Sequence, residues 1–236
     1  MQTRKITDSG TEMSESFLTM AFLSLSGGLQ DAYTYLVRGK VFANAQTGNV
    51  VLLSCSLFEG DWVHVLRYLI PLLFFAIGIA AAEEIRLRSR QHAGLHWRQL
   101  VLLVEIALLF LVGFLPEDWN LLANAVVSFS CAMQVQAFRS IRGYSFASTM
   151  CIGNIRSGVE ALCDYSHGKD RALLSKAGCY FGVVLLFACG AGIGGLLSSV
   201  WNQAAIWASC LLLLVSFLLM FIRRQPAGSS APAASE

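Results

Sequence analysis

Charged side chains are scarce in this sequence. Lys, Arg, Asp and Glu make up 14% of the 236 residues, whereas 56% of the residues are hydrophobic. Soluble domains carry roughly 25% charged residues, and so few charges would not cover the surface of a water-soluble body. The composition therefore excludes an ordinary soluble domain and predicts a protein whose solvent is the lipid bilayer.

The motifs of common enzymes and metal sites are also missing. The seven cysteines form no C-x-x-C pair and lie mostly in apolar stretches, where free thiols act as small hydrophobic groups. The sequence has no H-E-x-x-H, no Walker A and no G-x-S-x-G motif. A net charge of +2 without a basic stripe argues against a nucleic-acid partner. We therefore expect no enzymatic activity, no catalytic residue, no metal site and no cofactor.

Six apolar segments have the length of a membrane span, close to the ~20 residues that cross a hydrocarbon core. They are approximately Phe17–Leu36, Leu66–Ala82, Trp97–Leu115, Trp119–Phe138, Ala177–Trp201 and Ala204–Ile222. All five tryptophans lie at or near segment ends, where interfacial aromatic residues belong. Thr47–Phe58 and Ser148–Cys163 are too short or too polar for ordinary spans, and we interpret them as broken or re-entrant helices.

The two parts of the sequence resemble each other. SGGLQDAYTYLVRGKVFANAQTGNVV aligns with SCAMQVQAFRSIRGYSFASTMCIGNIR. The matched pairs are Gln30 with Gln134, Arg38 with Arg142 and, after a one-residue insertion, Gly48-Asn49 with Gly153-Asn154. Each half has the order span, short segment, span, span. We predict a first membrane repeat over residues 17–115 and a second over 119–222, flanked by a cytoplasmic segment 1–16 and a disordered cytoplasmic tail 223–236.

The distribution of positive charge predicts the topology. Lys and Arg gather in the N-terminal segment, in the loops 86–98 and 164–176, and at the start of the tail. The connections 116–118 and 201–203 carry no cation. Cytoplasmic loops are enriched in Lys and Arg, so the basic regions and both termini should be cytoplasmic. This assignment works with six crossing segments and two short segments that do not cross.

Three spans per half is an odd number, so the second half should be inverted relative to the first. Inverted repeats with broken helices are typical of secondary transporters, whose site lies at the repeat interface near the middle of the bilayer. The fold class predicted is therefore an all-α membrane protein with six transmembrane helices, two short helices and two inverted repeats. The exceptions to the charge rule are Arg38 and Lys40, which this topology puts outside.

The two Gly-Asn pairs are the first candidate site. Gly48 and Gly153 allow close backbone approach, and the amides of Asn49 and Asn154 can donate and accept hydrogen bonds. A short helix that ends inside the protein has unpaired backbone groups and a dipole end that can bind an ion or a polar substrate. The alternative is that Gly and Asn only cap and pack a helix break.

Further candidates are polar residues inside the apolar segments. Gln30, Asp31 and Gln134 lie toward the ends of the first and fourth spans, and Val135 stands where Asp31 would recur. Polar groups at such depth are costly and usually face a cavity or a partner. Asp31 could bind a cation or proton, pair with Arg38, or be an acid at the membrane interface.

Glu105 and Arg156 complete the candidate set. Glu105 is near the middle of its apolar segment, and it could carry a proton or be a neutral, hydrogen-bonded structural group. Arg156 and Glu160 are four residues apart and share a helix face, which favours a structural ion pair over an arginine that faces substrate. Glycines crowd the fifth span, where small residues allow helices to pack closely within one chain or in a homodimer.

The stretch GGLQDAYTYLVRGKVFANAQTGNVVLL resembles the YoaK-like family of bacterial membrane proteins. Members have G-x-x-D-A-x-x-[YF]-L followed by F-x-x-x-x-T-G-N, and then a second G-M-Q-N-A…T-G-N motif. The second copy here departs from that pattern, with AMQVQ and IGN at residues 132–136 and 152–154. The resemblance covers nearly all of residues 17–222 and implies a multi-pass protein of the bacterial cell membrane. It implies no activity, because the family is functionally uncharacterised.

These features together predict a small secondary transporter or permease in the bacterial inner membrane. Its partners would be the lipid bilayer and a small molecule or ion bound near the two Gly-Asn pairs. The alternative is a membrane scaffold or sensor that transports nothing. A polar cavity reaching both Gly-Asn pairs would favour transport, and a dry, packed centre would favour the scaffold.

Overall fold

The protein is described by a computed structural model for residues 17–89, 97–141, 144–145 and 149–220. Its α-helices in this part of the chain are α1 (Phe17–Val37), α2 (Gln46–Glu59), α3 (Trp62–Ser89), α4 (Trp97–Val112), α5 (Asn120–Ala137), α6 (Cys151–Gly168), α7 (Arg171–Trp201) and α8 (Ile206–Leu219). The short 3₁₀ turns η2 (Glu117–Trp119) and η3 (Asn202–Ala205) precede α5 and α8, and β1 (Ser140–Ile141) pairs antiparallel with β2 (Tyr144–Ser145). The predicted all-helical class is therefore confirmed, whereas the predicted terminal segments and most of the loop 86–98 lie outside the described residues.

Capping residues mark the end of α2 and the start of α7. Gly60 follows α2 in the left-handed conformation at φ 74°, and its N–H bonds to Leu57 O at 3.2 Å, as in a common helix C-cap. Asp170 precedes α7, and its side chain accepts a hydrogen bond from Ala172 N at 2.9 Å, as in a typical N-cap. The α2–α3 and α6–α7 connections are therefore tight turns, and each pair of helices forms a hairpin.

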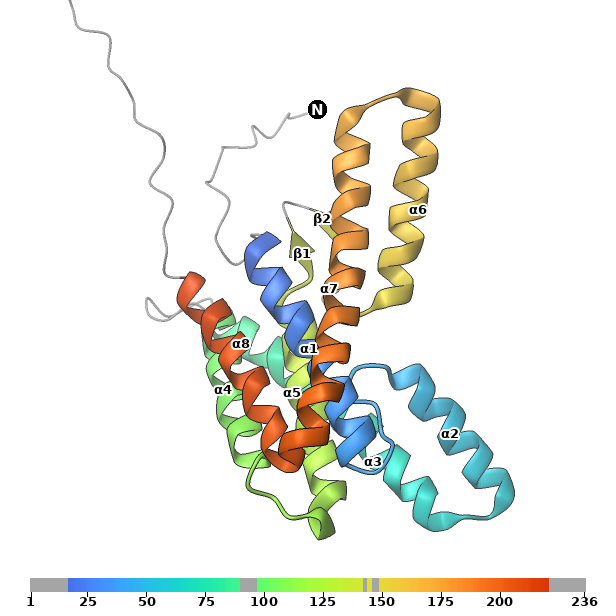
Figure 1. Cartoon of the computed structure of the whole chain (residues 1–236), viewed down its shortest axis with the longest axis vertical. Helices are drawn as coiled ribbons and strands as arrows, with labels where there is room; N and C mark the ends of the chain where they lie inside the picture. The colour runs from blue at the N-terminus through green and yellow to red at the C-terminus, as the bar shows by residue number, and fades with distance from the viewer. Residues whose placement is uncertain (1–16, 90–96, 142–143, 146–148, 221–236) are drawn as a thin grey trace, which may run out of the picture.

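Helices α1 and α5 form the centre of the bundle (Figure 1). α1 packs against α7 and α8, and α5 packs in the same way against α3 and α4. α4 and α8 contact each other, α2 lies along α3, and α6 lies along α7. The two hairpins extend from the body in different directions (Figure 1). The core between these helices contains apolar residues such as Leu23, Leu102 and Leu213, which are fully buried.

Glycines allow the central helices to approach closely. A Cβ atom at Gly78 in α3 would collide with the backbone oxygen of Phe129 in α5. A Cβ at Gly190 in α7 would collide with the backbone oxygen of Leu25 in α1. Small residues at helix crossings maximise van der Waals contact between membrane helices. The glycines predicted to pack the fifth span therefore include one that lies directly on the backbone of α1.

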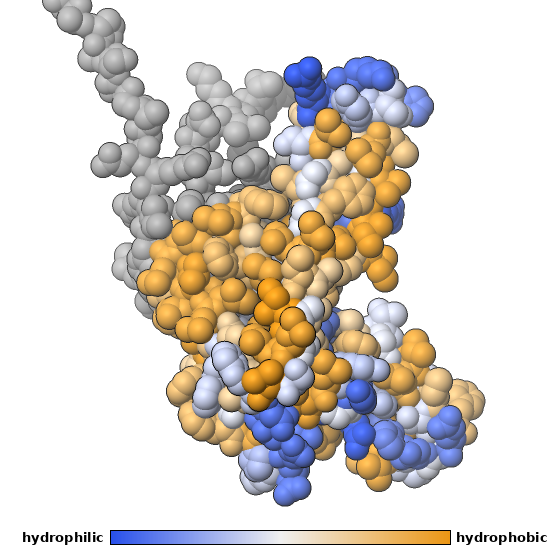
Figure 2. Space-filling model, in the orientation of Figure 1, coloured by the Kyte–Doolittle hydropathy of each residue, from blue (hydrophilic) through white to orange (hydrophobic). Residues whose placement is uncertain are grey.

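The outer surface is apolar over a broad band. Figure 2 shows this band over α7 and α8, between hydrophilic ends at the α6–α7 turn and the α4–α5 connection. Large exposed side chains in it include Leu185, Leu196 and Leu211. Two described helical stretches, Trp62–Arg88 and Arg171–Leu219, are long and apolar enough to cross a membrane by length and composition.

Helix lengths differ from the predicted apolar segments. α3 and α7 have 28 and 31 residues and are longer than the predicted segments. Hydropathy detects only the most apolar part of such a helix and misses the polar turns at its ends. α4 and α8 have 16 and 14 residues, so they measure about 24 and 21 Å, less than a hydrocarbon core of ~30 Å. The second short helix ends at Gly168, five residues beyond its predicted end.

Candidate functional site

Four helices bring polar side chains together in the middle of the bundle. We name Ser26 and Gln30 of α1, Glu105 of α4, Cys131 of α5 and Ser209 of α8 the central polar cluster; all five are buried. The Gln30 side-chain nitrogen Nε2 lies 3.0 Å from Ser26 Oγ, 2.9 Å from Ser209 Oγ and 3.3 Å from Glu105 Oε1. The Cys131 thiol donates to the other end of the same amide, Gln30 Oε1. Gln30 therefore links all the other members of the cluster.

Glu105 is fully buried and has no counter-charge among the described residues. Its Oε1 accepts from Gln30, and its Oε2 has no hydrogen-bond partner among the described residues. The ion pairs between described residues are elsewhere, as in the exposed pair of Arg156 with Glu160. An ionised carboxylate without a partner in an apolar interior is very costly. This position is therefore suited to a group that gains and loses a proton or meets a polar ligand.

Asp31 holds the loop that leads into α2. Its Oδ1 accepts a hydrogen bond from the backbone N–H of Asn44 at 2.6 Å, and the Asn44 side chain donates to Gly27 O at 3.2 Å. No ion pair joins Asp31 to Arg38 in the described part of the chain, so the structure does not support that one of the three alternatives for Asp31. Asp31 is next to Gln30 in sequence, but its carboxylate faces this loop.

The first Gly-Asn pair also holds the loop in place. Asn49 Oδ1 accepts from Phe42 N at 3.0 Å, and Asn49 Nδ2 donates to Phe42 O at 2.6 Å and to Gln46 Oε1 at 2.8 Å. A Cβ at Gly48 would press against the Phe42 ring. Both ends of the Asn49 amide are thus engaged, as the capping interpretation of this pair expects.

The second pair has a matching place but a different environment. Asn154 is the fourth residue of α6, as Asn49 is of α2, and both are buried. At Gly153, a Cβ would meet no described heavy atom within 4 Å. Arg156 is 79% exposed and pairs with Glu160 at 2.8 Å. This geometry agrees with the structural ion pair rather than with an arginine that faces an internal site.

The starts of the two short helices meet at α1. Asn44, just before α2, donates to Gly27 O, and a Cβ at Gly27 would collide with the methyl group of Thr149, just before α6. Gly27 is three residues from Gln30, so both starts lie within about one turn of the central polar cluster. Gln134 of α5 faces α1 as well, because its Nε2 donates to Leu23 O at 3.3 Å.

Arg38 is a fully buried cation at the end of α1. Its Nε donates to Tyr33 Oη at 2.7 Å, its Nη2 to Val112 O at 3.0 Å and its Nη1 to Leu115 O at 2.9 Å. Further acceptors of Nη1 are Pro116 O and Asn120 Oδ1. The carboxyl end of a helix has unpaired carbonyls and a partial negative charge. Arg38 therefore fastens α1 to the end of α4.

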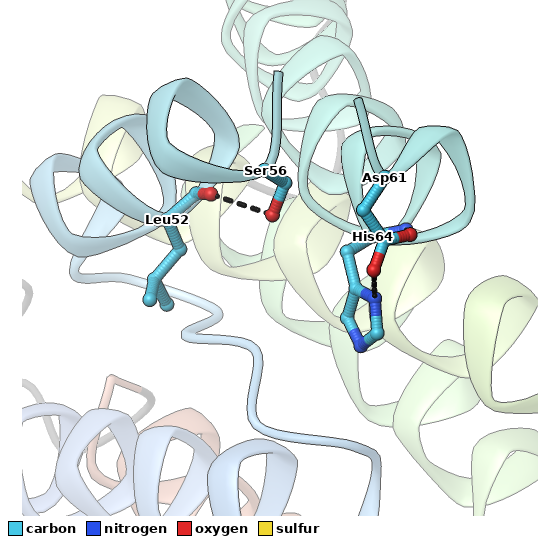
Figure 3. A network of polar contacts seen from close by, with 4 residues as sticks. All are labelled: Leu52, Ser56, Asp61 and His64. Atoms are coloured by element: carbon cyan, nitrogen blue, oxygen red, sulfur yellow. Dashed lines mark hydrogen bonds and ion pairs between the residues drawn. The ribbon is translucent and has the colours of Figure 1, made fainter. Parts of the chain in front are cut away.

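A separate polar group caps the α2–α3 turn (Figure 3). Asp61 accepts from His64 N at 3.1 Å and lies 2.6 Å from His64 Nδ1, while Ser56 Oγ donates to Leu52 O at 2.9 Å. The hydrogen bonds from the backbone and ring of His64 hold the pKa of Asp61 below its ordinary value. Both side chains are partly exposed, so this group is a helix cap at the protein surface.

Comparison with known proteins assigns the chain to a family. Residues 19–219 match a family described as "Protein of unknown function (DUF1275)". The chain belongs to this DUF1275 family. It is also similar to "UPF0700 transmembrane protein YoaK" of Bacillus subtilis strain 168, at 24% identity over 203 residues that cover 82% of this chain and 89% of that protein. No solved structure matches. The expected YoaK-like resemblance is confirmed, and this DUF1275 member is a helical membrane protein.

Sequence reasoning found some members of the central polar cluster of this DUF1275 protein and missed others. Gln30 and Glu105 stood out as polar residues in apolar segments. Ser26, Cys131 and Ser209 did not, because short polar side chains are common in membrane helices. The internal repeat indicated one of them: Ser209 follows Glu105 by 104 residues, the same offset that relates Gln30 to Gln134, so Ser209 occupies the position of Glu105 in the second half.

Proposed function

We propose that the protein is a small secondary transporter whose binding centre is the central polar cluster. The observation that carries the proposal is Glu105, a buried carboxyl where α1, α4, α5 and α8 meet, without a counter-charge in the part of the chain that the structure describes. Ionisable groups inside a membrane are costly and mark pathways of ions, protons or substrates. The starts of both short helices lie about one turn from this centre, and they offer helix-dipole ends to a polar substrate.

The transporter has two repeats in this proposal, α1–α4 and α5–α8. Exchanging the two sets leaves the main packing partners unchanged: α1 with α7 becomes α5 with α3, and α1 with α8 becomes α5 with α4. The glycine crossings correspond too, because Gly78 meets Phe129 and Gly190 meets Leu25, which precedes Phe129 by 104 residues. This correspondence supports a repeat whose symmetry axis passes near the contact between α4 and α8.

The second repeat is inverted in this proposal, with α2 and α6 not crossing the bilayer. On one side of the bundle, Arg38 contacts Leu115, and Gln203 donates to Glu117. On the other side, contacts join the end of α3 to the end of α5, the start of α4 to the end of α5, and the end of α8 to the start of α1. These pairs follow the order expected for six crossing helices.

The same contacts also support an orientation. The start of α1 and the end of α8 share a side, and the charge rule makes that side cytoplasmic in a bacterial cell membrane. Arg38, an exception to the charge rule, is then on the outer side. Its charge is buried against the end of α4, so it does not act as a free charge in a loop.

Reconstitution tests the proposal. The full chain in proteoliposomes should move at least one solute from a panel of amino acids, amines, organic acids and monovalent cations. That uptake should be lost in Glu105→Gln and Gln30→Ala and kept in Glu160→Gln, a matched carboxyl-to-amide change on an exposed residue. Folded wild-type protein that moves none of these solutes would argue for the second candidate.

The second candidate is a membrane scaffold or sensor without transport. The fully engaged amide of Asn49 favours it, because a group already bonded to its own loop is not free for a substrate. In that case Glu105→Gln should change only stability. The same set of variants, measured for both uptake and thermal unfolding, separates the two functions.

A further inference from the structure

We propose that Glu105 is the site of a coupling proton, one per chain, and that it is protonated in the conformation described. This inference rests on the proposed transport function and names its coupling ion. It stands on the geometry of the central polar cluster, which offers a carboxyl group to a proton but offers no empty oxygen cage to a metal cation.

The position of Gln30 argues against a metal ion. Hard cations bind where several oxygen atoms converge on one point. Here Ser26 Oγ, Ser209 Oγ and Glu105 Oε1 do converge, but the point is occupied by Gln30 Nε2, a hydrogen-bond donor within 3.3 Å of all three. The amide oxygen, which could ligate a cation, faces the Cys131 thiol instead. The Cys131 contact thus supports the orientation of the amide.

The charges around Glu105 favour a neutral carboxyl. The titratable groups beside Glu105 are the thiols of Cys131 on α5 and Cys210 on α8, and the carboxyl of Asp31 on α1, which is bonded to the loop before α2, also acts electrostatically on Cys131. None of them is a cation, and Arg38 is committed to the end of α4. An added proton removes the charge that the apolar interior penalises. Binding joins one proton from water to the carboxylate, and release returns it to water, so no further reactant is needed.

The number of protons follows from the second half of the chain. Ser209 stands 104 residues after Glu105 and touches the same Gln30 nitrogen. The centre therefore has one acid and one hydroxyl rather than two acids. Asp31 is not a second carrier, because its carboxylate binds the backbone N–H of Asn44. One chain should move one proton per cycle at this position.

Infrared difference spectroscopy of the full chain in lipid nanodiscs tests the protonation. At neutral pH the wild type should show a protonated-carboxyl C=O band that shifts in heavy water. The band should be lost in Glu105→Gln and kept in Asp31→Asn and Glu160→Gln. The absence of the band in wild type, or its persistence in folded Glu105→Gln, overturns the proposal. If Glu105→Gln fails to fold, Asp31→Asn still assigns the band, because Asp31 is the other buried acid among the described residues: a band kept in folded Asp31→Asn supports the proposal, and a band lost there overturns it.

Uptake measurements separate this inference from the proposed function. Pyranine inside the proteoliposomes reports proton movement while a solute from the panel is taken up. Proton movement that accompanies uptake and is lost in Glu105→Gln supports coupling. Uptake that needs sodium, or that ignores a pH gradient and survives Glu105→Gln, overturns coupling and leaves transport standing. No uptake by wild type, with the infrared band present, overturns transport and with it the coupling role.

Discussion

Replacing Arg38 with Met removes the donor that fastens the end of α1 to the end of α4. The guanidinium makes good bonds to two carbonyls, at 3.0 Å to Val112 O in the last residue of α4 and 2.9 Å to Leu115 O just beyond α4, and one bond to the Tyr33 hydroxyl at 2.7 Å. A hydrogen bond to a charged group contributes about 1.5–3 kcal/mol, so the three bonds amount to roughly 5–9 kcal/mol. The desolvation of the buried guanidinium costs several kcal/mol in the wild type, and Met does not have this cost. The net loss is therefore smaller than the sum of the three bonds.

We therefore expect Arg38→Met to lower the free energy of unfolding by about 3 kcal/mol. For a chain of this size the midpoint of thermal unfolding should fall by roughly 6–12 °C. Arg38→Lys should fall between Met and wild type, because Lys keeps the charge but loses the planar fork that reaches two carbonyls at once. Differential scanning fluorimetry in one detergent measures all three proteins.

Arg156→Met is the control, because it removes the same charge from a side chain that is 79% exposed. It should change the midpoint little, since exposed ion pairs contribute at most about 1 kcal/mol. If Arg38→Met unfolds at the same temperature as this control, or at a higher one, the carbonyl contacts of Arg38 do not stabilise the bundle.

Three further predictions concern packing, topology and pH. Gly190→Val should unfold the protein or abolish its expression, because a Cβ there collides with the α1 backbone. Gly192→Val on the same helix should be tolerated, because a Cβ there meets no described atom within 4 Å. Equal yields of folded protein from the two variants would contradict the close crossing of α1 and α7. Cysteines at Lys40 and Arg139, both exposed, should react with an impermeant maleimide from opposite faces of the membrane, and labelling from one face would refute the inversion. Asp61→Asn should lower the unfolding temperature at neutral pH. The difference in unfolding temperature between variant and wild type should disappear as pH falls below the ordinary Asp pKa of 3.8, because a carboxyl with a lowered pKa stabilises the fold only while it is ionised. A difference that is unchanged in acid would refute the role of Asp61 as a cap.

The sequence predicted the kind and order of the helices well, because each apolar segment has a composition that only a helix can satisfy in lipid. It predicted helix ends poorly. Hydropathy measures apolar content, so the polar turns that extend α3 to Ser89 and begin α7 at Arg171 were assigned to loops. Gly60 and Asp170 are residue types typical of helix caps, and they mark the end of α2 and the start of α7 in the sequence.

The candidate site was predictable as a list of residues but not as an arrangement. Glu105 and Gln30 stood out because polar groups are rare in apolar segments. Their contact joins α1 to α4 across 75 residues, and no local pattern encodes such a distance. A pairing of Arg38 with Asp31 was one of three possibilities that the sequence left open. In the structure, Arg38 instead donates to carbonyls at and just beyond the end of α4, which are far from it in sequence and become its neighbours only when the bundle packs.

The packing of α1 has a consequence for biosynthesis. Of the described helices α1 is made first, yet its main neighbour is α7, which begins at Arg171. Until α7 is made, the face of α1 that meets Gly190 lacks its partner, although Glu105 and Cys131 can already contact Gln30. α5 is better placed, since α3 and α4 are already made when it emerges. Completion of the bundle therefore waits for the last third of the chain, and a ribosome that stalls before α7 leaves a polar α1 in the membrane for quality-control proteases.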